Sequence, residues 1–132
     1  MADVASIRLF QGLPDKELKE IARELREVHH PAGKEVVTVG EGGVGFMSVA
    51  EGRLAVELPD GRKREIAAGD SFGEMALLDQ RGRSATIKAE TDVVLLCIPE
   101  WNFKSFLSQH PEVSWRLLQT LSQRVRLAES GA

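Results

Sequence analysis

Segment 70–86 holds the residues whose types and spacing best suit ligand binding. A helix that begins near Gly73 would present free backbone N–H groups and the positive end of its dipole, and a glycine lets a ligand approach the main chain closely. Arg83 follows after a short polar loop and carries a planar set of donors that matches a phosphate group. The segment therefore predicts a binding site for an anion.

Glu74 does not fit a site for phosphate alone, because its carboxylate would repel a second anion. A carboxylate is useful beside a ligand that offers hydroxyl groups, as a sugar ring does, since it accepts their hydrogen bonds. A structural alternative stays open, in which Glu74 and Arg83 form an ion pair that ties the loop to the rest of the domain.

The sequence Phe72-Gly73-Glu74-Met75-Ala76-Leu77-Leu78, followed by Arg83-Ser84-Ala85-Thr86, resembles the phosphate-binding cassette of the cyclic nucleotide-binding domain. This family includes the regulatory subunits of cAMP-dependent protein kinase, the bacterial catabolite activator protein and the cytoplasmic domains of cyclic nucleotide-gated channels. The resemblance covers nearly the whole chain, and the spacing from Glu74 to Arg83 fits the kinase type of cassette.

The resemblance assigns a role to each cassette position. Gly73 and Glu74 would hold the ribose 2′-hydroxyl, and Arg83 would bind the cyclic phosphate with help from the backbone N–H groups of Ala76 and Ser84. The supporting positions would be Phe72, Leu77, Ala85 and Thr86. No cofactor is expected, because the cyclic nucleotide is the ligand; cAMP is favoured over cGMP, although Ser84 is compatible with both.

Length and composition indicate a single soluble globular domain. The chain has 132 residues, 42% of them hydrophobic and 28% charged. The net charge of −3 argues against a nucleic-acid partner, which normally needs a basic face. Four basic residues lie near one expected hairpin turn, where they are interpreted as solvated: Arg53, Arg62, Lys63 and Arg64.

The cellular compartment is predicted from the cysteine content and from the absence of targeting segments. Cys97 is the single cysteine and lies in the apolar segment 92–98, so we expect a small buried side chain in a reducing environment. The sequence shows no signal segment and no apolar run near the roughly 20 residues that span a membrane. These features predict a cytoplasmic protein without a membrane span.

The hydrophobic pattern predicts helices at both ends of a domain made of short strands. A helix is expected after Pro14, with Asp15 as its N-cap, and a shorter helix within 3–10. Strands are expected at 34–39, 45–50, 53–58, 63–67, 83–89 and 93–98. Two helices are expected after Pro99, with Trp101 and Trp115 on their buried faces.

The predicted fold class is α+β, an antiparallel β jelly roll with an N-terminal helix and C-terminal helices. The single domain would cover 1–132, with N-terminal helices in 1–27, the jelly roll in 28–99, its cassette in 70–86, and C-terminal helices in 100–132.

The predicted function is regulatory binding of a cyclic nucleotide, without catalysis. The resemblance implies that the C-terminal helices move when ligand binds, and that an attached or docked effector domain responds. It also implies a residue that covers the base from the last helix. Because the sequence ends at Ala132, we expect no base cap from this chain.

Two other functional classes were weighed. The domain could have lost its ligand and serve as a protein-interaction module, although the intact cassette argues against this. A metal-dependent jelly-roll enzyme would need several inward-facing histidines. The adjacent His29 and His30 would point to opposite faces of a strand, so no metal site is expected, and no catalytic triad or nucleotide-phosphate loop is present.

Overall fold

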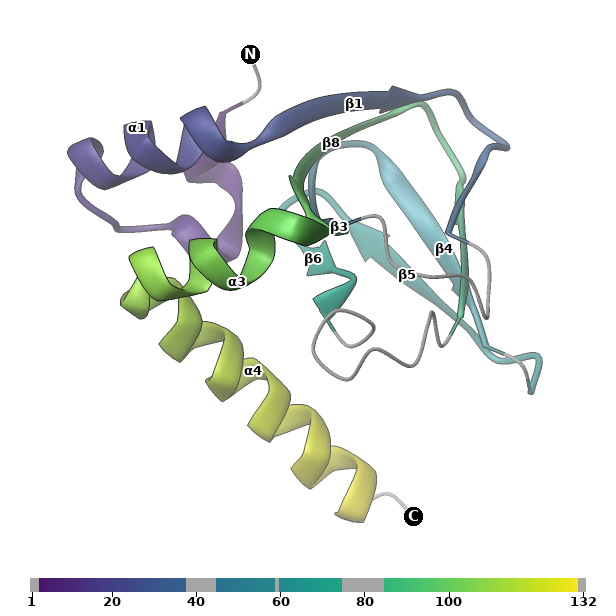
Figure 1. The fold of residues 1–132 in the computed structure, drawn as a ribbon. Coiled ribbons are helices and arrows are strands. Elements are labelled where there is room, and N and C mark those ends of the chain that lie inside the picture. The colour runs from purple at the N-terminus through teal and green to yellow at the C-terminus, as the bar shows by residue number, and fades with distance from the viewer. Residues whose placement is uncertain (1–2, 38–44, 59, 75–84, 131–132) are drawn as a thin grey trace.

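The computed structural model describes residues 3–37, 45–58, 60–74 and 85–130. The chain starts with two short 3₁₀ helices, η1 (Val4–Ser6) and η2 (Arg8–Phe10), and continues into helix α1 (Asp15–Glu24). The strands occupy the middle of the sequence, and helices α3 (Glu100–Gln109) and α4 (Pro111–Ser130) follow them. Figure 1 shows α1 and α3 beside the strands and α4 extending away past β6.

The strands form two four-stranded antiparallel sheets. One sheet has the order β1 (Arg26–His30), β8 (Val93–Pro99), β3 (Gly45–Glu51) and β6 (Ser71–Phe72). The other has the order β2 (Glu35–Val37), β7 (Thr86–Ala89), β4 (Arg53–Glu57) and β5 (Lys63–Ala67). This arrangement confirms the predicted antiparallel jelly roll with flanking helices.

Two apolar clusters hold the layers together. The first fills the space between the sheets and includes alternate residues of β4, Leu54 and Val56, opposite Leu95 of β8. The second lies under the helices and joins Phe46 and Ile98 to residues of α1, α3 and α4. Strands β3 and β8 contribute to both clusters, so both of their faces are buried, as their nearly continuous apolar sequences require.

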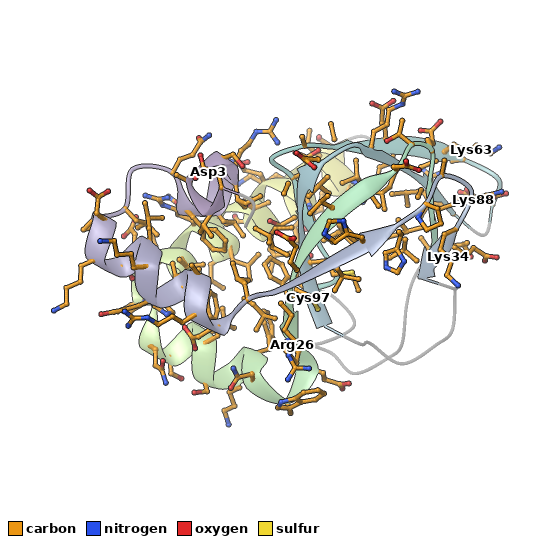
Figure 2. The ribbon with its side chains drawn as sticks, turned by 90° about the horizontal axis from the view of Figure 1, so that it is seen from above. Asp3, Arg26, Lys34, Lys63, Lys88 and Cys97 are labelled. Carbon is orange, nitrogen blue, oxygen red and sulfur yellow. The ribbon has the colours of Figure 1, made fainter. Side chains whose placement is uncertain are left out.

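Cys97 lies on β8 and is 7% exposed, which confirms the prediction of a small buried side chain. Figure 2 labels it beside Arg26 of β1, whose backbone it opposes in the sheet register. The same view shows Lys34, Lys63 and Lys88 at the end of the strand region that lies away from the helices.

Several local expectations differ from the structure. The helix expected within 3–10 is two 3₁₀ turns, and the expected strand at 34–39 is described as β2 over Glu35–Val37. Asp15 is not the N-cap of α1, because Pro14 occupies that position and Asp15 is the first helical residue. Its carboxylate is still favourable there, since it lies at the positive end of the helix dipole.

The prediction that Trp101 and Trp115 are buried is wrong, because their side chains are 75% and 59% exposed. The inward faces of their helices are occupied by other apolar side chains, Phe103 and Phe106 on α3 and Val113 and Leu117 on α4. Trp101 instead lies under the guanidinium group of Arg26, at 5.3 Å from the ring centroid. Within the described ranges, none of the helices has the length and apolar character needed to cross a membrane.

Candidate ligand-binding site

A cavity of about 530 Å³ lies between the strands and the inner face of α4. This volume falls in the range of small-molecule sites, roughly 300 to 1,000 Å³. Three parts of the chain form its wall. They are the 3₁₀ segment with Arg8 and Leu9, the strand region with Phe46, Val56, residues 64–66 and 69–74, Ala85 and Ile87, and the α4 residues Arg116, Leu117, Gln119, Thr120, Gln123 and Arg124.

Glu74 lies in this wall and is 3% exposed. One of its carboxylate oxygens, Oε1, accepts a hydrogen bond from Nη1 of Arg124 on α4. A buried carboxylate is costly without a cation or donors nearby, so this contact compensates the charge of Glu74. It also joins the strand region to the outer half of the last helix.

The backbone at Gly73 has a φ of +101°, in the left-handed region that side chains rarely adopt. The preceding strand β6 is fixed to β3 by paired backbone and by the hydroxyl groups of Ser71 and Ser48, whose oxygens are 2.8 Å apart. Glycine at position 73 therefore lets the chain turn sharply at the end of β6 and leaves the adjacent cavity open to a ligand.

The N-terminal segment braces the cavity from the other side. Arg8 forms an ion pair with Asp70, and its backbone N–H donates to the carbonyl of Gly69 at 3.0 Å. Nη1 of Arg116 on α4 donates to the carbonyl oxygens of Leu9 and Gln11, at 3.0 and 2.7 Å. These bonds hold the first half of α4 against the N-terminal segment.

The structure places four of the predicted cassette residues in the cavity wall: Phe72, Gly73, Glu74 and Ala85. Thr86 is half-buried at the start of β7 and is not part of the wall. The other four, Ala76, Leu77, Arg83 and Ser84, lie outside the described residues. The alternative ion pair between Glu74 and Arg83 is therefore untested, and the partner that the structure gives Glu74 is Arg124.

Sequence reasoning missed the contribution of α4 and of Arg64. The pattern of α4 contained a usable signal, because Arg124 continues the face of the buried residues Val113 and Leu117 at helical spacing. Arg64 was assigned to a solvated hairpin turn, yet it lies on β5 and lines the cavity. Six residues of this last helix line the cavity: Arg116, Leu117, Gln119, Thr120, Gln123 and Arg124.

The part of the chain that the structure describes contains no group of three or more histidine, cysteine, aspartate or glutamate side chains arranged to hold a metal ion. The cavity wall itself offers hydrogen-bond donors, acceptors and charges. Arginines and a buried carboxylate face a common space, an arrangement suited to a ligand with both anionic and hydroxyl groups.

Comparison with known proteins identifies similar chains. The sequence model of the cyclic nucleotide-binding domain matches residues 27–110. A cyclic nucleotide-gated potassium channel of Rhizobium etli is 40% identical over 121 residues, which are 92% of this chain and 34% of the channel. The chain thus spans about a third of the length of that relative.

Two solved structures share the fold. The catabolite activator protein of Thermus thermophilus superposes with a TM-score of 0.84 at 29% identity, covering 94% of this chain and 61% of that protein. The cAMP-bound PfPKA-R structure gives a TM-score of 0.82 at 24% identity and covers 97% and 45% of the two chains. The second likeness is one of fold alone.

Proposed function

Because the chain belongs to the cyclic nucleotide-binding domain family, we propose that its cavity binds a 3′,5′-cyclic nucleotide, with cAMP favoured over cGMP. The family is regulatory and generally non-catalytic. The observation that carries the proposal is the buried Glu74 beside Gly73 in the cavity wall, at the two cassette positions predicted to hold a ribose.

In this proposal the ligand is held at both ends of its ribose phosphate. The carboxylate of Glu74 accepts the 2′-hydroxyl hydrogen bond, and Arg83 with the N–H groups of Ala76 and Ser84 binds the cyclic phosphate. Gly73 has no side chain, so the sugar can approach the main chain closely at this position. Gln123 of α4 faces the same cavity and offers both a donor and an acceptor to a base.

Calorimetric titration of the purified chain with cAMP and with cGMP tests the proposal. We expect cAMP to bind more tightly, by a few fold, in a one-to-one complex. A cGMP affinity about tenfold better, or 1.4 kcal/mol, would reverse the assignment of the base. If neither nucleotide gives a heat of binding or protects backbone amides against hydrogen exchange, the other candidate function is favoured. In that case the chain is a jelly-roll domain that has lost its ligand and binds a protein instead.

The ion pair between Glu74 and Arg124 supports a second part of the proposal, that binding is transmitted through α4. A ribose that hydrogen bonds to Glu74 changes the surroundings of the carboxylate that holds the outer half of α4. A ligand shifts an equilibrium only by its difference in affinity for the two states, and this shared carboxylate provides such a difference. The responding partner is proposed to be an attached or docked effector domain.

We expect Arg124→Ala to loosen the outer half of α4 and to reduce its response to cAMP. The last buried residue of the helix is Leu117, so Arg124 is the main polar contact beyond it among the described side chains. Hydrogen exchange of residues 119–130, measured with and without cAMP, should show about fivefold less protection in the variant, as expected for losing a partly exposed charged hydrogen bond.

Arg126→Ala is the matched control, since Arg126 lies on the same helix and is exposed. The amides of residues 119–130 in this variant should show the same hydrogen-exchange protection as in the parent. Identical protection of α4 with and without cAMP in the parent would contradict transmission through this helix, while leaving nucleotide binding intact.

A further inference from the structure

The corner between α3 and α4 contains a buried histidine between two carboxylates. The side chain of His110 is 2% exposed. Its Nδ1 lies 3.0 Å from Oε2 of Glu17, and its Nε2 lies 2.8 Å from Oε2 of Glu24. Glu17 and Glu24 are two turns apart on one face of α1, so the imidazole ring lies between them.

Both contacts are hydrogen bonds only when both ring nitrogens carry a proton. A carboxylate accepts hydrogen bonds and does not donate them, whereas a neutral imidazole has one donor and one acceptor nitrogen. The neutral ring would therefore satisfy Glu17 or Glu24 but would turn a lone pair toward the other. The observed geometry is that of the imidazolium ion.

The charges around the ring favour this ion. Burial alone lowers the pKa of His110, but the hydrogen bonds to Glu17 and Glu24 and their negative charges outweigh it, so that the pKa is raised above its ordinary value. Glu20 and Arg23 of α1 line the same small hollow as the ring. On α4, Arg116 pairs with Glu112 and with the N-terminal segment.

The position of His110 couples the ring to the path of the chain. Its backbone N–H donates to the carbonyl of Phe106, and its own carbonyl accepts from the N–H of Ser114, both at 3.1 Å. Its ring packs on Phe106, with 4.8 Å between the centroids. One residue therefore ends α3, begins α4 and contacts α1 through its side chain.

We propose that His110 is a proton-controlled clamp, in which the imidazolium fixes the corner of α3 and α4 to α1 and loss of its proton releases that corner. The clamp contributes fully to stability below about pH 6.5, the ordinary pKa of histidine, and its contribution is lost as pH rises through the raised pKa of the folded protein. The release is thus expected above about pH 6.5, the ordinary pKa of histidine, and it does not require a ligand.

Nitrogen NMR of the histidine rings in the intact chain tests the protonation directly. At pH 6 we expect both nitrogens of His110 to be protonated, because its pKa is raised, and we expect His30 to lose its proton at lower pH than His110, because burial and, secondarily, Lys34 lower its pKa. A His110 ring with one protonated nitrogen at pH 6 would overturn the proposal. This measurement needs no variant, so it stands even if a substitution impairs folding.

Glu17→Gln and Glu24→Gln test the clamp, with Glu129→Gln as the matched control, an exposed carboxylate at the far end of α4. We expect each of the first two to move the His110 titration to lower pH, and the control to leave it unchanged. In the parent, protection factors of amides at the start of α4 should fall about fivefold between pH 6 and 9 relative to those of β3, as for loss of one charged hydrogen bond. An unmoved titration, or α4 protection independent of pH, would refute the clamp.

Discussion

Arg83→Ala is expected to weaken cAMP binding by about 2–5 kcal/mol, or roughly 1.5 to 3.5 decades in affinity. The substitution leaves the cyclic phosphate with backbone donors alone, in a cavity where an unpaired anion is poorly solvated. Lysine at position 83 should restore only part of the affinity, because an ammonium group lacks the planar pair of donors of a guanidinium group. Calorimetric titration of the three proteins measures the effect.

Arg62→Ala provides the control for this experiment. Arg62 is an exposed arginine that pairs with Asp60 in the turn after β4, so its removal should leave cAMP affinity unchanged. Equal affinity of the Arg83→Ala protein and the parent would remove the cassette assignment altogether, and the phosphate contact would have to be sought among the arginines that line the described cavity.

Glu74→Ala should weaken cAMP binding by about 1.5–3 kcal/mol, the usual range for a hydrogen bond to a charged group. The loss should shrink when 2′-deoxy-cAMP is the ligand, because the hydroxyl partner is then already absent. The loss caused by Arg83→Ala should persist with the same analogue, since that contact goes to the phosphate. Titration of both variants with both nucleotides separates the sugar contact from the phosphate contact.

Glu57→Ala is the matched control, because Glu57 is an exposed carboxylate of β4 outside the described cavity wall. If Glu74 serves only to pair with Arg124, its replacement should lower thermal stability and weaken both nucleotides equally. That result would retain the ion pair as a structural element and exclude Glu74 from the ribose site.

The strand pattern was predictable because it depends on local sequence. Alternation in β4 follows from the pleat, in which Leu54 and Val56 point inward, and Gly73 marks a turn that other residues adopt poorly. The orientation of the helices was not predictable to the same degree. Trp101 and Trp115 are apolar, but which side of a helix is buried depends on the surfaces it meets.

The partner of Glu74 shows a second limit of sequence reasoning. Sequence reasoning offered a cassette neighbour, Arg83, only as an alternative partner that lies outside the described residues, and it did not indicate Arg124, which the structure brings in from a position 50 residues away. The same applies to His110 and Glu17, which are 93 residues apart. Contacts of this kind are set by how the helices pack on the sheets, and no single sequence pattern contains that information.

The bracing of the N-terminal segment by Arg116 has a consequence for how the molecule is made. The carbonyl groups of Leu9 and Gln11 meet their guanidinium donor only after more than a hundred further residues have been synthesised, the separations being 107 and 105 positions. Strand β1 likewise cannot pair until β8 has been synthesised, because β8 is its partner in the sheet. Contacts so distant in sequence slow folding, so the cavity is completed only after α4 has been synthesised.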